Sequence, residues 1–150
     1  MKNDSEQIEG EKGVYHITTS GLSLRQPIQR ILFATDSFSD FKDCLELVRS
    51  RGIEVRQVRD GRSCVDEALR GKESGKPFDV IVVSVDLPVL DGFSTAMLLR
   101  DNDCARVIIS MDSTEHYIQE EESVQAGCDL HWHAESLPGD LASLIGASAR

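Results

Sequence analysis

Several side chains that could take part in chemistry stand at or just after the ends of short apolar runs. They are the carboxylates of Asp36 and Asp86 and the hydroxyls of Ser84 and Ser110. Mg²⁺ usually takes one or two carboxylates among its oxygen ligands, so Asp36 alone would hold it weakly. The hydroxyl of Ser84 becomes a good nucleophile only beside a base, and the sequence identifies none. Two structural alternatives stay open: Asp36 can cap a following helix, and Asp86 can be an exposed loop carboxylate.

Two histidines form a second group of candidate residues. His131 and His133 belong to the run Leu130–His133, and their spacing places them on one face of a strand. Two imidazoles can bind a metal ion. No third ligand stands within sequence reach, so we expect packed histidines beside Trp132, which is most simply a core anchor.

These residues depend for their positions on apolar runs that alternate with amphipathic segments. Five strands are predicted, each followed by a helix. The strands are Ile31–Ala34, Val55–Val58, Val80–Val83, Val107–Ser110 and Leu130–His133. Strict alternation of this kind argues for a doubly wound α/β domain, with a parallel sheet between two helical layers. In such sheets, sites form beyond the carboxyl ends of the strands.

The chain divides into two parts by composition. Residues 1–29 are polar, and we expect a partly disordered N-terminal arm in which Val14–Thr19 could form a short strand. Residues 30–150 carry the alternating pattern and form the domain. The stretch Val80–Val83 is apolar and β-branched throughout, so it should be a central strand that is covered on both faces.

Composition excludes several classes of function. The 150 residues suffice for one domain, and 16 basic against 26 acidic residues give a net charge of −10. This balance argues against nucleic-acid binding and against a polybasic membrane surface. The four cysteines are at least 20 residues apart, without zinc-site spacing, and should be small buried residues. The N-terminus has no apolar signal segment, so a cytoplasmic location is expected.

Five motifs carry a resemblance to a known family. They are RILFATDS, VRDGRSCVDEAL, FDVIVVSVDLPVLDG, VIISMDSTEHY and AGCDLHWHAESLPGDL. Over about residues 30–148 the chain resembles the receiver domain of response regulators, the CheY-like domain of two-component signalling. The resemblance implies a flavodoxin-like, three-layer αβα fold whose five-stranded parallel sheet has the order 2-1-3-4-5.

The chain departs from the family at the positions of its phosphorylation pocket. The resemblance implies two acidic residues that hold Mg²⁺, an aspartate that accepts the phosphoryl group, a hydroxyl and a lysine. The residues at these positions here are, in order, Thr35 and Asp36, Ser84, Ser110 and Ala134. A shift of one residue would replace Ser110 by Met111. The aromatic residue that rotates on activation in the family is here His131.

We therefore expect a degenerate receiver, or pseudo-receiver, that is not an enzyme. It would need no cofactor, bind Mg²⁺ weakly at best, and act through protein–protein contacts with a signalling partner or a second copy in a homodimer. Its expected interaction face includes Tyr117, Glu121 and His131. Two alternatives remain: a response regulator that accepts phosphoryl groups at Asp86 or Ser84, and a small-molecule-binding domain on the same fold.

Overall fold

The computed structural model describes most of the domain and three short segments before it. The described residues are 8–9, 15–18, 21–24, 28–37, 41–104, 106–112 and 120–133, with only the backbone described for the first three segments and for residue 120. Among these residues, no helix has the length and apolar character that crossing a bilayer requires.

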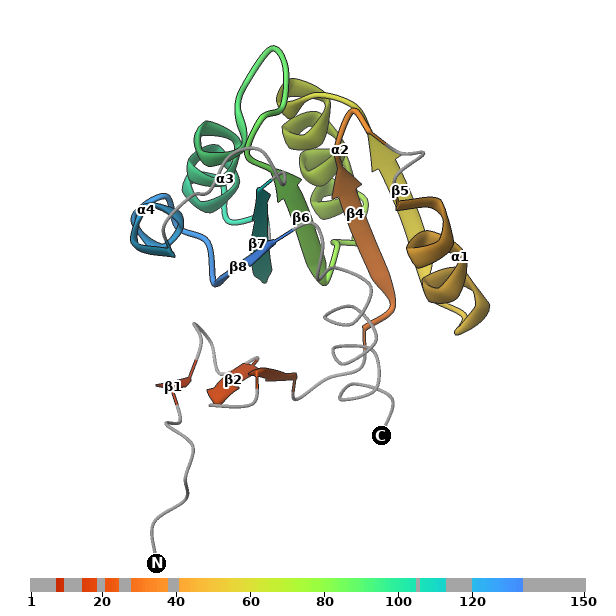
Figure 1. Ribbon diagram of the computed structural model, residues 1–150. Coiled ribbons are helices and arrows are strands. Elements are labelled where there is room, and N and C mark those ends of the chain that lie inside the picture. The colour runs from red at the N-terminus through yellow and green to blue at the C-terminus, as the bar shows by residue number, and fades with distance from the viewer. Residues whose placement is uncertain are drawn as a thin grey trace, which may run out of the picture.

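Five strands form one parallel sheet (Figure 1). The strands are β4 (Arg30–Ala34), β5 (Glu54–Val58), β6 (Val80–Ser84), β7 (Val107–Asp112) and β8 (Leu130–His133). Their spatial order is β5-β4-β6-β7-β8. This is the order 2-1-3-4-5 in chain sequence, so the predicted topology is confirmed.

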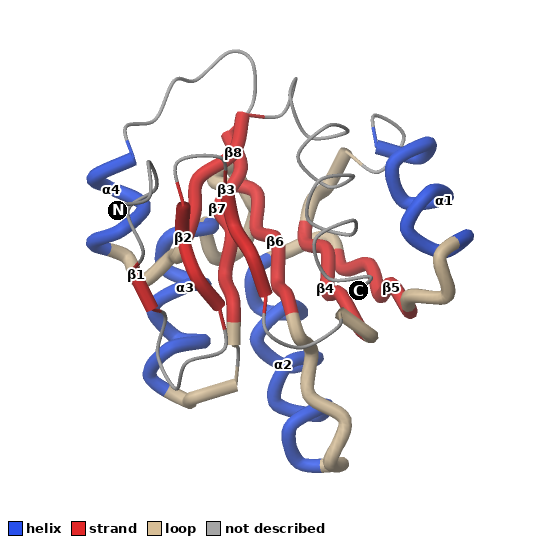
Figure 2. Tube along the Cα trace, turned by 90° about the horizontal axis from the view of Figure 1, so that it is seen from below, coloured by secondary structure: helices blue, strands red, loops and turns tan. Residues whose placement is uncertain are grey.

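Four described helices cover the two faces of this sheet. They are α1 (Lys42–Ser50), α2 (Gly61–Glu73), α3 (Gly92–Asp101) and α4 (Glu120–Gln125). Core residues of α2 and α3 pack with Leu32, Ile81 and Ile108 on one face, while α1 packs with Phe33 and Val82 on the other. The helices α2 and α3 run side by side (Figures 1 and 2). The helix expected after Pro138 lies outside the described residues.

The central strand is buried as its sequence predicts. Each residue of Val80–Val83 has 0% exposure, because successive side chains enter the two opposite core clusters. Helices pack on both faces of the parallel sheet, so this strand has no solvent-facing side, which explains its unbroken run of β-branched residues. The prediction of a doubly covered third strand is therefore confirmed.

A second, smaller sheet precedes the domain. It is antiparallel, with the order β1-β2-β3, and consists of β1 (Ile8–Glu9), β2 (Tyr15–Thr18) and β3 (Gly21–Leu24). The strand considered for Val14–Thr19 corresponds to β2. The short strand β1 falls within the stretch for which a disordered tail was expected.

Asp91 and Asp36 differ in their relation to the helices that follow them. Asp91 caps α3, since its carboxylate accepts a hydrogen bond of 2.8 Å from the Ser94 amide. Asp36 does not cap the first helix. That helix begins at Lys42, and its cap position, Phe41, makes no side-chain capping bond.

Gly92 holds the start of α3 directly against the end of β6. Its amide donates to the Val85 carbonyl at 3.0 Å, and a Cβ there would overlap the carbonyl of Ser84. Because the obstacle is backbone, we expect Gly92→Ala to lower the free energy of unfolding by about 2 kcal/mol, measured by urea denaturation. The control Met97→Ala, at a half-exposed position of the same helix, should change it by less than about 0.5 kcal/mol. Equal stability of Gly92→Ala and the parent chain would contradict this packing.

Candidate functional site

The carboxyl ends of β4 and β6 bring two hydroxyl groups together. Thr35, the residue after β4, is buried with 1% exposure. The Ser84 hydroxyl at the end of β6 donates to the Thr35 hydroxyl over 3.4 Å, and the Ser37 amide donates to the same oxygen at 3.1 Å. The structure therefore places Thr35 and Ser84 side by side at the sheet edge, as neutral groups.

The two candidate carboxylates near this pair are exposed to solvent. Asp36 follows Thr35 on the surface, where the Ser37 hydroxyl lies 3.4 Å from its carboxylate. Asp86 lies in the loop after β6 and is also exposed, as the structural alternative predicted. An exposed carboxylate stays well hydrated, so neither residue gives the Ser84–Thr35 pair a desolvated anionic neighbour.

Ser110 does not lie at the end of its strand. The strand β7 continues for two residues beyond it, to Asp112. The Ser110 hydroxyl is buried, 2.7 Å from the Ser123 hydroxyl of α4 and 2.6 Å from Nδ1 of His131. Ser110 therefore lies inside the strand, two residues before its end. The alternative, Met111, points into the core cluster on the α1 side.

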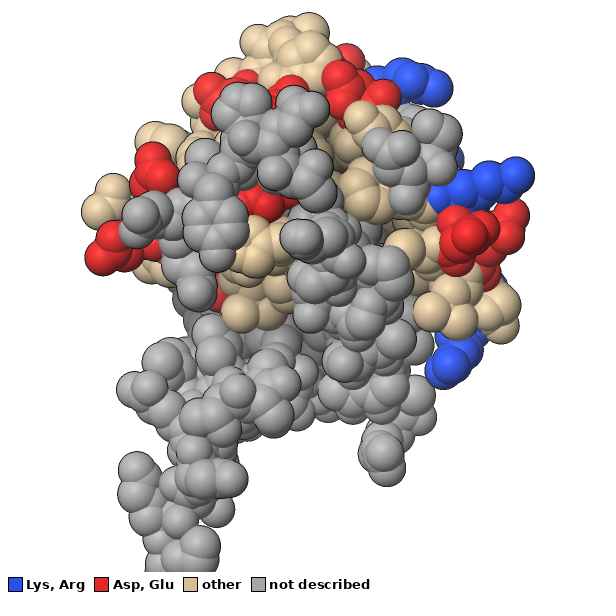
Figure 3. Space-filling view, viewed as in Figure 1, with Lys and Arg blue, Asp and Glu red and all other residues tan. Residues whose placement is uncertain are grey.

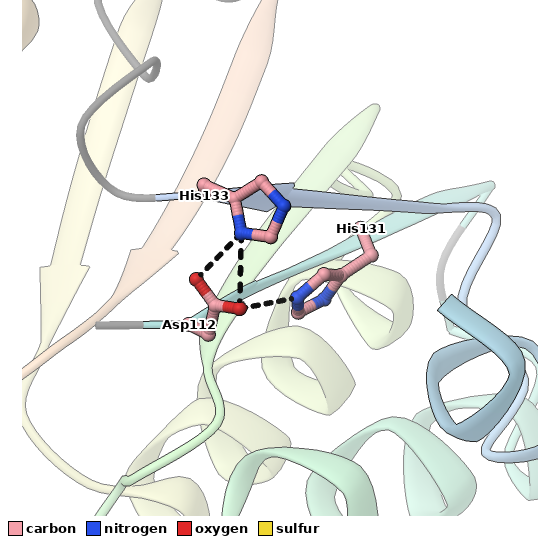
Figure 4. Close-up of side chains that lie close together, drawn as sticks. All are labelled: Asp112, His131 and His133. Atoms are coloured by element: carbon pink, nitrogen blue, oxygen red, sulfur yellow. Dashed lines mark hydrogen bonds and ion pairs between the residues drawn. The ribbon is translucent and has the colours of Figure 1, made fainter. Parts of the chain in front are cut away.

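Asp112 instead lies at the end of β7 and contacts both histidines of β8 (Figure 4). Its Oδ2 is 3.0 Å from Nε2 of His131, and its Oδ1 is 3.0 Å from Nδ1 of His133. The side chains of Asp112 and His131 are 2% and 1% exposed, whereas that of His133 is 37% exposed. The result is a carboxylate between two imidazoles, largely removed from water.

The register of two parallel strands creates this cluster. Ser110 pairs with His131, and Asp112 pairs with His133. Because side chains alternate across a sheet, all four point to the face that α4 covers. Sequence reasoning missed Asp112 because the strand was ended at Ser110. One signal was available in the sequence: Ser110 and Asp112 are two residues apart, and so are His131 and His133.

The expected interaction face is only partly available. His131 cannot contribute to it, because its ring is buried between Ser110 and Asp112, so this assignment is corrected. Glu121 is exposed on α4. Tyr117 and Ala134 lie outside the described residues.

The cysteines are buried, as predicted. All four are free thiols in the core, and burial raises the pKa of each of them. A raised pKa keeps a thiol protonated, and only the thiolate is a good nucleophile or metal ligand. These residues therefore serve as small apolar core residues.

A cleft of about 720 Å³ opens at the opposite, amino-terminal edge of the sheet. Two ion pairs occur among its charged lining residues: Arg30 lies 3.2 Å from Glu54, and Arg106 lies 3.3 Å from Asp79. Sites in open parallel sheets form at the carboxyl edge instead. The position of this cleft therefore does not support the alternative of a small-molecule-binding domain.

The comparisons with known proteins agree with the fold. No family model matches the chain. The transcriptional regulatory protein PrrA of Mycobacterium tuberculosis is 39% identical over 88 residues, which are 57% of this chain and 35% of PrrA. Histidine protein kinase 1 of Candida albicans is 29% identical over 87 residues, or 58% of this chain and 4% of that protein. The chain thus spans about a third or less of these curated relatives.

A solved structure gives the same result. The receiver domain of a sensor histidine kinase from Pseudomonas aeruginosa superposes with a TM-score of 0.61 and 27% identity, covering 79% of this chain and 98% of that domain. That structure contains a magnesium ion in its active-site cleft. The five-stranded domain therefore has the CheY-like fold of receiver domains. The expected resemblance to the receiver domains of two-component signalling is confirmed.

Proposed function

We propose that this receiver domain works without being phosphorylated and transmits signals through contacts with other proteins. The observation that carries the proposal is the Ser84–Thr35 pair. By the resemblance, these positions belong to the phosphoryl acceptor and to a carboxylate that holds Mg²⁺. Here they carry two neutral hydroxyls 3.4 Å apart.

Charge explains why this substitution opposes phosphoryl transfer. The reaction needs a nucleophile in line with the phosphorus and cations that neutralise the charge on the equatorial oxygens. The Ser84 hydroxyl is neutral, and its bonded neighbour, Thr35, is a hydroxyl rather than a base. Of the two positions that hold Mg²⁺ by the resemblance, Thr35 and Asp36, only Asp36 carries a carboxylate. That carboxylate is exposed to solvent.

The contacts of His131 support a fixed conformation. By the resemblance, the aromatic residue at the position of His131 rotates on activation. His131 is bonded on both ring nitrogens, to Ser110 at 2.6 Å and to Asp112 at 3.0 Å. Rotating the ring outward would break both bonds and leave a buried carboxylate without one of its partners, which is costly.

Weak Mg²⁺ binding is an expected consequence. A calorimetric titration of the full chain should give a Kd no tighter than about 1 mM, equivalent to about −4 kcal/mol. The reason is that Asp36 alone supplies a carboxylate where the resemblance implies several. A matched titration of Asp36→Asn should differ little from that of the parent chain. Micromolar affinity in the parent chain, lost in Asp36→Asn, would show that the family's metal site persists.

The acidic surface of α4 suggests the chemistry of a partner. Glu121 and Glu122 are exposed there, and Figure 3 shows acidic side chains over α4 without Lys or Arg beside them, whereas on the side of α1 and β5 the Lys and Arg side chains are mixed with Asp and Glu. Acidic surfaces steer complementary charge. We therefore propose a basic partner surface opposite α4.

Charge reversal tests this surface. Partner proteins are first captured with the full chain and purified. The double variant Glu121→Lys, Glu122→Lys should bind them more weakly than the parent chain does. The double variant Asp43→Lys, Glu46→Lys on α1 should bind them as the parent chain does. Both control residues are also exposed. Self-association measured by sedimentation velocity would show whether a second copy is among the partners. If the α4 variant keeps every interaction of the parent chain, the proposed surface is wrong.

A phosphoryl mimic tests the proposed function itself. BeF₃⁻ with Mg²⁺ should leave amide hydrogen exchange in β7, α4 and β8 unchanged, because the pocket lacks the charges that would hold this anion. The magnesium-binding Pseudomonas receiver domain serves as the positive control. Increased protection of these elements in this chain would support the rival function, phosphoryl acceptance at Ser84 or Asp86.

A further inference from the structure

The Asp112 cluster has the composition of a transition-metal site. Its three residues each offer one ligand atom, and these atoms lie within 4.8 Å of one another. From this geometry we propose that Asp112, His131 and His133 bind a divalent first-row transition-metal ion, with Zn²⁺ as the representative ion. Two imidazoles and one carboxylate suit such ions, whereas Mg²⁺ and Ca²⁺ prefer oxygen ligands alone.

The distances from the Asp112 carboxylate to the two imidazoles are close to those in a metal site. Zn²⁺ lies about 2.0–2.2 Å from nitrogen and oxygen ligands, so two ligands in a tetrahedral site are roughly 3.3–3.5 Å apart. The carboxylate of Asp112 lies 3.0 Å from Nε2 of His131 and 3.0–3.1 Å from Nδ1 of His133. In the protonated cluster these contacts are hydrogen bonds. A metal ion would replace the shared protons, because histidine ligates through an unprotonated nitrogen.

The surroundings of His131 match those of a metal ligand. Metal-bound histidines usually donate their other ring N–H to a neighbouring group, which fixes the tautomer and the ring orientation. Nδ1 of His131 lies 2.6 Å from the Ser110 hydroxyl, which in turn lies 2.7 Å from that of Ser123. This chain of hydroxyls leaves Nε2 directed at Asp112. It also holds the ring in place before a metal arrives.

The three ligand residues differ in their burial. Asp112 and His131 are buried and fixed by the register of β7 and β8, whereas His133 is 37% exposed at the end of β8. A metal ion could therefore reach the cluster from the side of His133. Among the described residues, the group whose ligand atoms lie this close together contains no cysteine.

The test uses the tag-free full chain, stripped of metal and kept reduced without a chelating thiol. Calorimetric titration with Zn²⁺ should show one ion per chain with a Kd of about 1 µM or tighter, at least about 1000-fold tighter than Mg²⁺. His133→Ala should weaken Zn²⁺ binding by about 100-fold, and Ser110→Ala by roughly tenfold. His16→Ala, the same substitution on β2, is the matched control and should keep the parent affinity.

Co²⁺ provides an independent readout of the ligand atoms. Its visible spectrum should indicate nitrogen and oxygen ligands, without the near-ultraviolet charge-transfer band that a thiolate produces. If His133→Ala unfolds, Asp112→Asn and His133→Gln take its place in the binding measurement. Circular dichroism shows whether each of them is folded. The proposal is overturned if the parent chain binds Zn²⁺ more weakly than about 100 µM. Equal binding by the folded ligand variants, or a thiolate band with Co²⁺, would also overturn it.

Discussion

Replacing Asp112 by alanine should be among the most destabilising single changes at the carboxyl edge of the sheet. We expect Asp112→Ala to lower the free energy of unfolding by about 3 kcal/mol, or roughly 6–12 °C in Tm. The carboxylate is 2% exposed and bonds both His131 and His133. Its removal takes away the hydrogen-bond partner of the buried Nε2 of His131, so the cost of removing that nitrogen from water is no longer offset.

Urea denaturation in the presence of a chelator measures this effect without any contribution from bound metal. The matched control is Asp36→Ala, which removes an exposed carboxylate from the end of β4. It should change stability by less than about 0.5 kcal/mol. Asp112→Asn, which keeps one oxygen acceptor, should fall between the two. Similar stability of Asp112→Ala and Asp36→Ala would show that the cluster contributes nothing to the folded state.

Restoring the acceptor alone should fail to restore phosphorylation. Ser84→Asp would place a new carboxylate beside the buried Thr35 and near Asp36, without the second metal carboxylate or the lysine of the family. Like charges at short range raise a carboxyl pKa rather than create a reactive nucleophile. Acetyl-phosphate labelling of Ser84→Asp, read by intact mass, should therefore stay close to background.

Adding the missing charges should change this result cooperatively. Thr35→Asp supplies the second metal carboxylate, and Ala134→Lys supplies the cation at a position assigned from the sequence. Groups that act as a unit have strongly non-additive effects, so the triple variant should label far more than the sum of the single variants. Strong labelling of Ser84→Asp alone would mean that the remaining pocket is still competent.

The fold could be predicted because its signals are local and repeated. Each strand is an apolar run, and the unbroken run Val80–Val83 required cover on both faces, which the two core clusters provide. The alternation of strands and helices then limits the topology to a few parallel arrangements. The start of α1 was harder to place. Its cap position, Phe41, has no side-chain capping bond, so no polar residue marks where the helix begins.

The site was only half predictable, because part of it depends on register. Thr35 directly follows β4 and Ser84 is the last residue of the neighbouring β6, so their contact follows from the topology. The Asp112 cluster needs β7 to extend two residues past Ser110 and to pair with β8 in one particular register. A one-residue slip would send Asp112 to the other face of the sheet. Sequence periodicity does not fix strand ends to that accuracy, so the third ligand beside His131 and His133 was not foreseen.

The most direct measurement for the central claim is the intact mass of the unmodified full chain after incubation with acetyl phosphate and Mg²⁺. The magnesium-binding Pseudomonas receiver domain, treated in parallel, confirms that the donor is active. We predict that the control gains the mass of one phosphoryl group and that this chain gains none, because Ser84 and Thr35 form a neutral pair where the family's charged groups belong. A phosphoryl adduct on this chain that maps to Ser84 or Asp86 would contradict the account.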